Sequence, residues 1–155
     1  MEKFNSATLE DYNILLNLVN EFEFDNQVSY QGIKNIDQKK VKSENKKYVK
    51  KYLQQKTCNY LLCRQKAEIL GYIFLSIDQT YLGEGYINEL YVLPTLRKNG
   101  FGTRLVKLGL KWLKEKNCKT ISITVNRKNK NALKLYKKFG FEIHKDSYVS
   151  MQIKF

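Results

Sequence analysis

The segment 97–102, which reads Arg-Lys-Asn-Gly-Phe-Gly, constrains the fold more than any other part of this 155-residue chain. An apolar, strand-like run precedes it at residues 87–93 and ends at the only proline, Pro94, and a helical pattern opens directly after it. Two glycines between a strand and a helix let the backbone approach a ligand without Cβ clashes. The free N–H groups of the helix start favour an anion. The sequence therefore predicts a phosphate-binding loop, to which Arg97 and Lys98 add positive charge; a plain glycine-bearing connection is the alternative.

A second block, at residues 129–141, favours the phosphate-binding interpretation of the loop. It reads Asn-Lys-Asn-Ala-Leu-Lys-Leu-Tyr-Lys-Lys-Phe-Gly-Phe. Residues Asn129, Ala132, Tyr136 and Gly140 follow one another at spacings of three and four, so they share one helix face. Neither block is a Walker loop or a complete three-glycine dinucleotide fingerprint.

Together the two blocks resemble the Gcn5-related N-acetyltransferase (GNAT) superfamily. In that family Arg/Gln-x-x-Gly-x-Gly/Ala binds the pyrophosphate of acetyl-coenzyme A, and Asn-x-x-Ala-x-x-x-Tyr-x-x-x-Gly-Phe carries a tyrosine next to the thioester sulfur. The matching residues are Arg97, Gly100, Gly102, Asn129, Ala132, Tyr136, Gly140 and Phe141. The resemblance covers residues 69–142 and extends over the first 60 residues by layout only.

The resemblance implies a set of residues that contact acetyl-coenzyme A (acetyl-CoA), the acyl donor, with no metal. Backbone groups of the strand would bind the pantetheine arm, one N–H would face the thioester oxygen, and the loop would bind the pyrophosphate. The predicted coenzyme-binding residues are Leu90, Tyr91, Val92, Arg97, Lys98, Asn99, Gly100, Phe101, Gly102, Thr103, Asn129 and Tyr136. Core packing is a second role for Leu90 and Val92.

Two side chains are candidates for proton transfer. Tyr136 is the predicted general acid for the leaving thiolate, because a phenol with a pKa of about 10 stays protonated at neutral pH; a core tyrosine is the alternative. Glu89 is the candidate base. In a regular strand Glu89 shares a face with Ile87 and Tyr91, and a carboxylate among apolar neighbours needs a reason. An ion pair with a lysine is the alternative for Glu89.

The periodicity predicts one domain over residues 1–155, of the α/β (α+β) class. Helices are expected at about 8–23, 44–55, 103–116 and 129–139, with Thr8 as the first N-cap. Strands are expected at 60–64, 69–77, 86–93, 120–125, 141–144 and 148–154. With the family resemblance, this order predicts a mixed, mostly antiparallel sheet of six to seven strands with helices on both faces.

The net charge of +13 is unevenly distributed. The first 96 residues hold 12 basic and 12 acidic residues, so the whole excess lies in residues 97–155. Coenzyme A is a polyanion and fits this half. A basic nucleic-acid-binding domain is an alternative, but no helix-turn-helix or RNA-binding fingerprint is present. A coenzyme-binding member without catalysis is a third reading.

The acceptor is expected to be a primary amine, either of a small molecule such as a polyamine or of a peptide or protein. Acidic side chains at Glu21, Glu23 and Asp25, with Glu84 and Glu89 near the central strand, favour a cationic acceptor. The alternative is that Glu21 and Glu23 are solvated and pair with lysines. Three unevenly spaced cysteines and the absence of an apolar leader or span predict a cytoplasmic protein that does not enter a membrane. A homodimer is compatible with the sequence.

Overall fold

The computed structural model describes residues 2–80, 83–144 and 148–155. Its strands form one seven-stranded sheet in the order β1-β2-β3-β4-β5-β7-β6. The neighbours β4 and β5 are parallel, and the other five pairs are antiparallel. This is the mixed, mostly antiparallel sheet that the sequence predicts.

The elements follow the predicted order, preceded by one additional strand. The strands are β1 (Lys3–Ser6), β2 (Cys58–Gln65), β3 (Glu68–Ile77), β4 (Glu84–Val92), β5 (Thr120–Asn126), β6 (Glu142–His144) and β7 (Tyr148–Lys154). The helices are α1 (Tyr12–Asn26), α2 (Gln38–Leu53), α3 (Phe101–Glu115) and α4 (Lys130–Lys137). Short helical turns lie at Leu9–Asp11, Gln27–Gln31 and Pro94–Leu96.

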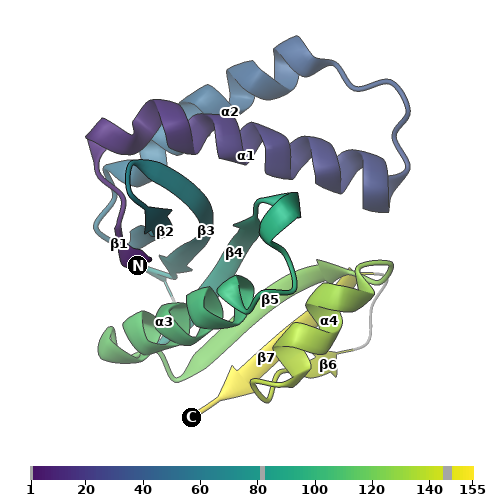
Figure 1. The fold of residues 1–155 in the computed structure, drawn as a ribbon. Coiled ribbons are helices and arrows are strands. Elements are labelled where there is room, and N and C mark those ends of the chain that lie inside the picture. Colours follow the sequence, from purple (N-terminus) through teal and green to yellow (C-terminus); the bar gives the residue numbers. More distant parts are fainter. Residues whose placement is uncertain (1, 81–82, 145–147) are drawn as a thin grey trace.

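Helices cover both faces of the sheet (Figure 1). On one face α1 and α2 pack on β2, β3 and β4; on the other, α3 and α4 pack on an aliphatic cluster. Helix α3 turns an apolar face toward the core: Leu105 and Leu113 are fully buried, and Trp112 is half-buried. No helix of the described residues is long and apolar enough to cross a membrane.

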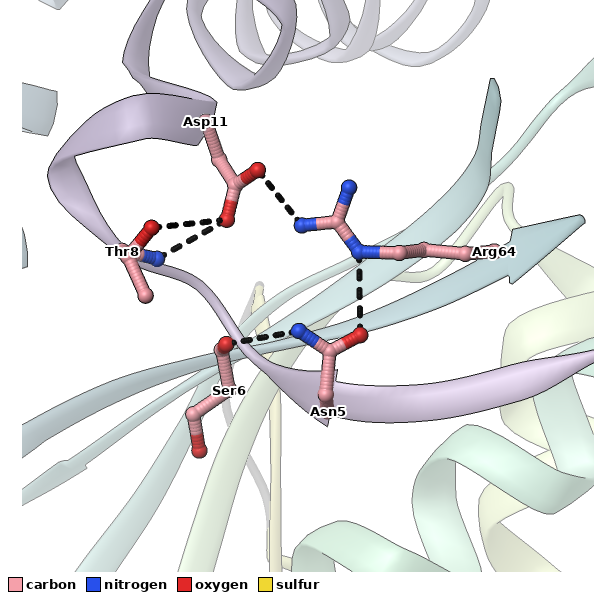
Figure 2. Close-up of polar contacts among 5 residues, drawn as sticks. All are labelled: Asn5, Ser6, Thr8, Asp11 and Arg64. Carbon is pink, nitrogen blue, oxygen red and sulfur yellow. Dashed lines mark hydrogen bonds and ion pairs between the residues drawn. The ribbon is translucent and has the colours of Figure 1, made fainter. Parts of the chain in front are cut away.

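The sequence pattern does not predict strand β1, because three of its four residues are polar and exposed. Strand β1 pairs with the edge of β2. Arg64 of β2 contacts both β1 and the helical turn Leu9–Asp11 that follows β1 (Figure 2). Arg64 Nε donates to Asn5 Oδ1 at 2.9 Å, and its guanidinium pairs with Asp11 at 2.6 Å. Burial alone would raise the pKa of Asp11. The backbone N–H of Thr8 and the Arg64 cation outweigh that effect, so the pKa of Asp11 lies below its ordinary value. Tertiary contacts, and not local pattern, therefore place β1.

The first helix ends later than predicted, and the second begins earlier. Helix α1 continues to Asn26 and passes into the Gln27–Gln31 turn, which ends at Gly32 with φ +72°. Helix α2 begins at Gln38 because the Asp37 side chain accepts a hydrogen bond from the Lys40 N–H at 3.0 Å. Much of the chain between the two predicted helices is therefore helical.

Candidate active site

Strands β4 and β5 separate near the middle of the sheet. Their pairing runs from Glu84 opposite Thr120 to Ile87 opposite Ile123. Beyond that point β4 continues to Val92 and still pairs with β3, while β5 continues to Asn126 and pairs with β7. Residues 88–92 of β4 therefore have no strand partner on the β5 side among the described residues.

The register shows which backbone groups face this opening. The Leu93 N–H donates to the Leu70 carbonyl of β3 at 3.0 Å. In an antiparallel pair, the backbone N–H and C=O groups of successive residues point alternately toward the partner strand and away from it. The backbone groups of Tyr91 therefore face β3, and those of Leu90 and Val92 face away from β3. In agreement, the Val92 carbonyl accepts a hydrogen bond from Arg97 Nε at 3.0 Å. Of the three residues predicted to bind through their backbone, Leu90 and Val92 have their backbone groups on the side of the opening.

The loop after β4 presents a run of unpaired backbone donors. None of the N–H groups from Lys98 to Thr103 has a hydrogen-bond partner among the residues that the structure describes. They belong to the loop and to the first turn of α3, where N–H groups have no intrahelical acceptor. This surface suits an anion, and Lys98, Asn99 and Thr103 are exposed around it.

The two motif glycines serve different purposes. Gly100 has φ +83°, a left-handed conformation that residues with a Cβ rarely adopt, and a Cβ there would meet nothing within 4 Å. Gly102 lies in α3 close to both α4 and β4: a Cβ there would stand 3.6 Å from Leu135 Cδ2 and 3.9 Å from Leu90 Cδ2. Backbone conformation thus requires Gly100, whereas Gly102 borders β4 and α4.

The Arg97 side chain does not point along the loop. Besides the Val92 carbonyl, it binds Asp25 of α1, with Nη2 and Oδ2 2.9 Å apart, and it lies over the Tyr91 ring at 5.5 Å. The ion pair is about 40% exposed. Arg97 therefore joins β4 to the end of α1.

Tyr136 lies in the aliphatic cluster on the α3/α4 face. Asn129 begins α4 as its N-cap, since its Oδ1 accepts a hydrogen bond from the Ala132 N–H at 3.0 Å. The Tyr136 side chain is 2% exposed, and its ring packs edge-on against Phe141 at 5.6 Å. Burial raises the pKa of Tyr136 above its ordinary value. The hydroxyl forms no hydrogen bond with any described residue.

Glu89 lies on the opposite face, beneath α1 and α2, and is 9% exposed. The expectation that it shares a face with Ile87 is wrong. Phe74 is opposite Glu89 but Leu75 is opposite Ile87, so Asn88 is an extra residue, a β-bulge. The bulge leaves Ile87 in the aliphatic cluster and turns Glu89 toward Tyr72.

A tyrosine, and not a lysine, is the partner of Glu89. Tyr72 Oη donates to Glu89 Oε2 at 2.7 Å, and none of the described cations forms an ion pair with this carboxylate. Burial raises the pKa of Glu89 to about 7, although hydrogen bonding by Tyr72 and Tyr48 lowers it. A carboxyl with such a pKa can accept a proton near neutral pH.

Comparison with known proteins identifies the family. A model described as the acetyltransferase (GNAT) family matches residues 21–141. The chain belongs to this family. The match includes the end of α1, the separated strands β4 and β5, the loop and α4, so the geometry above is that of a GNAT chain.

Relatives and solved structures agree with this assignment. N-alpha-acetyltransferase 30 of Homo sapiens is 37% identical over 76 residues, which cover 48% of this chain and 21% of that protein. The PaiA N-acetyltransferase of Thermoplasma acidophilum, solved in complex with coenzyme A, superposes with a TM-score of 0.78 at 19% identity and covers 100% of this chain and 99% of that one. A spermidine N-acetyltransferase of Vibrio cholerae, solved with coenzyme A and spermine, has a TM-score of 0.75 at 16% identity, over 99% and 95% of the two chains. At these identities the structures show the GNAT fold alone. The chain spans about a fifth to three fifths of the length of three curated relatives that it matches, the human protein among them.

The acidic residues near α1 of this GNAT chain are already engaged. Glu21 accepts a hydrogen bond from Tyr91 Oη at 2.8 Å, Glu23 accepts one from Gln27 Nε2 at 2.6 Å, and Asp25 pairs with Arg97. Among the described residues, no lysine forms an ion pair with any of these three carboxylates. Their negative charge is used to fix the end of α1 to β4 and to the following turn.

Sequence reasoning missed the tyrosines that surround Glu89. The predicted strand 69–77 contains Tyr72 and the predicted helix 44–55 contains Tyr48, but neither prediction links these tyrosines to the carboxylate. The usable signal was the density of tyrosine, since 11 occur in 155 residues. Only the pairing of β3 with β4 shows that Tyr72 meets Glu89.

Proposed function

We propose that this protein is an acetyl-CoA-dependent N-acetyltransferase that transfers an acetyl group to a primary amine. The observation that supports this most strongly is the run of six unpaired N–H groups from Lys98 to Thr103, placed beside the opening between β4 and β5. An unpaired row of amides at a helix start suits a pyrophosphate, and an open strand edge suits the amide-bearing pantetheine arm.

The donor-binding residues follow from this geometry. Lys98, Asn99, Gly100, Phe101, Gly102 and Thr103 would bind the pyrophosphate through their backbone N–H groups. Leu90 and Val92 would bind the pantetheine arm, and one of their N–H groups would stabilise negative charge on the thioester oxygen. Arg97 would orient β4 through the Val92 carbonyl, and Asn129 would position α4. Bound acetyl-CoA would supply the acetyl group as an activated thioester.

Two residues would move protons. Glu89, on the α1/α2 face, accepts the proton that the amine loses as its nitrogen bonds to the acetyl carbon. Tyr136, on the α3/α4 face, donates its hydroxyl proton to the sulfur as the carbon–sulfur bond breaks. A buried acid that stays protonated and a carboxyl with a pKa near 7 are suited to these opposite tasks.

The acceptor class is a primary amine of a small molecule, a peptide or a protein. A lysine-type amine with a pKa of about 10.4 needs more than about 4 kcal/mol to become neutral at pH 7, whereas an α-amine needs about 1 kcal/mol. Dependence on Glu89 should therefore be steeper for a lysine-type or polyamine acceptor than for a peptide α-amine.

Thermal-shift measurements with coenzyme A and with oligonucleotides test the donor site. We expect the melting temperature to rise by several degrees with coenzyme A and to stay unchanged with oligonucleotides. A panel of amines, assayed by release of free thiol from acetyl-CoA, then tests catalysis. A shift with oligonucleotides alone would favour the nucleic-acid reading, and coenzyme binding without transfer to any amine would favour a non-catalytic module.

A further inference from the structure

The surroundings of Glu89 contain two buried tyrosine hydroxyls that differ in one respect. Tyr72 is 0% exposed and its hydroxyl donates to Glu89 Oε2 at 2.7 Å. Tyr60 is 1% exposed, and its hydroxyl is a buried polar atom without a hydrogen-bond partner among the residues that the structure describes. The two rings are neighbours, with centroids 5.8 Å apart. One hydroxyl of this pair is therefore committed to the carboxylate and the other is not.

We propose that Tyr72 is a positioning residue for Glu89: its hydroxyl fixes one carboxylate oxygen and stabilises the charged form, which is the form that accepts a proton. The inference rests on the proposed function, in which Glu89 takes the proton of the acceptor amine. Tyr72 itself contacts neither substrate in this scheme.

The groups that face Glu89 come from four elements. Tyr72 belongs to β3, Tyr60 to β2, Tyr48 to α2 and Glu23 to α1. Burial favours the neutral carboxyl most strongly, Tyr72 and then Tyr48 oppose that effect, and the Glu23 charge adds to it. Without the Tyr72 hydroxyl, burial is opposed more weakly, so a larger fraction of Glu89 is neutral at pH 7 and unable to act as a base.

Tyr60 offers a matched control. Its ring stacks on Phe74 with centroids 4.2 Å apart, in the same cluster as Tyr72. Tyr60→Phe removes the same atom from a similar depth but takes no hydrogen bond from the carboxylate. Deleting an unpaired buried hydroxyl is neutral or stabilising.

The experiment is the pH profile of kcat/KM for the wild type, Tyr72→Phe and Tyr60→Phe. We expect the rising limb of the Tyr72→Phe profile to lie about one pH unit or more above that of the wild type. Tyr60→Phe should leave the limb in place, and both variants should bind coenzyme A as the wild type does. A loss of activity at every pH without movement of the limb would overturn the inference, as would an equal shift in both variants.

A second readout does not require activity. The carboxyl carbon of Glu89 can be titrated by ¹³C NMR and assigned with Glu89→Gln; its pKa should rise in Tyr72→Phe and stay constant in Tyr60→Phe. If Tyr72→Phe does not fold, replacing Tyr72 with 3-fluorotyrosine keeps the ring and strengthens the donor, and the titration should then move to lower pH. An unchanged titration overturns the role of Tyr72 alone, whereas failure of the wild type to acetylate any amine overturns the proposed function.

Discussion

The two faces of the sheet are built from different side chains. Beneath α3 and α4 the core is largely aliphatic, and it includes Tyr136. Beneath α1 and α2 the core, here called the aromatic face, is richer in aromatic side chains: four of its ten buried hydrophobic residues are Tyr60, Tyr72, Phe74 and Tyr91. The buried carboxylate of Glu89 accepts its hydrogen bond from one of them, Tyr72. The aliphatic face encloses a general-acid candidate, and the aromatic face encloses a general-base candidate.

This difference shows how the two half-sites are specified. On the α3/α4 face the groups available to a ligand are mainly backbone N–H groups of residues 98–103, which need glycine and a helix start more than particular side chains. On the α1/α2 face the polar groups are side chains, whose effect depends on their partners. The first kind of site leaves a motif in the sequence, and the second does not.

Removal of the Tyr136 hydroxyl should have the largest effect. Tyr136→Phe keeps the packed ring but deletes the proton donor, so we expect turnover to fall by about 10²-fold or more. Coenzyme A affinity should change little. Steady-state kinetics with isothermal titration measures both, and an unchanged rate would leave Tyr136 as a packing residue of the aliphatic face.

Glu89→Gln should change how the free energy of unfolding depends on pH. The folded-state pKa of about 7 exceeds the ordinary 4.5, so between these values the unfolded chain loses a proton that the folded chain keeps. Wild-type stability should therefore fall as pH rises through this window and then level off, by up to about 3 kcal/mol in all. Glu89→Gln should lack this contribution.

Urea unfolding of both proteins at several pH values between 4 and 8.5 measures the difference. The variant should gain stability relative to the wild type as pH rises. A constant difference across the range would contradict a raised pKa for Glu89 and with it the contrast between the two faces.

Gly102→Val should weaken coenzyme A binding by about tenfold or more. A Cβ at this position already meets Leu135 and Leu90 at ordinary contact distance. The two further methyl groups of valine would therefore crowd these side chains and displace the loop that is proposed to bind the pyrophosphate. Gly102→Ala is the matched control, because its single methyl fits and it should bind within a few-fold of the wild type. Equal affinities for all three proteins would place the coenzyme elsewhere.

The smallest effect is expected where the two faces are linked. The ion pair of Arg97 with Asp25 is about 40% exposed, so Asp25→Asn should lower the free energy of unfolding by less than about 1 kcal/mol. A higher salt concentration should screen the ion pair and lower the free energy of unfolding of the wild type to that of Asp25→Asn. A loss of several kcal/mol would show that the end of α1 depends on this pair far more than its exposure suggests.

Local signals account for what the sequence determined. The strand before Pro94, the glycine loop, the start of α3 and the Asn129 cap of α4 each depend on residues within a few positions of one another. Backbone conformation and helix capping act over that range. The loop and its unpaired N–H groups therefore lie where the sequence predicts them.

Tertiary structure alone decided the rest. Strand β1 exists because it pairs with β2, the bulge at Asn88 turns Glu89 away from the face of Ile87, and Tyr72 reaches Glu89 across the β3–β4 register. Arg97 meets Asp25 across 72 positions of the chain. A shift of one residue in strand register moves a side chain to the opposite face, and nothing in the local pattern fixes that register. The donor loop could thus be predicted from sequence, whereas the environment of the candidate base is set by how distant strands and helices pack.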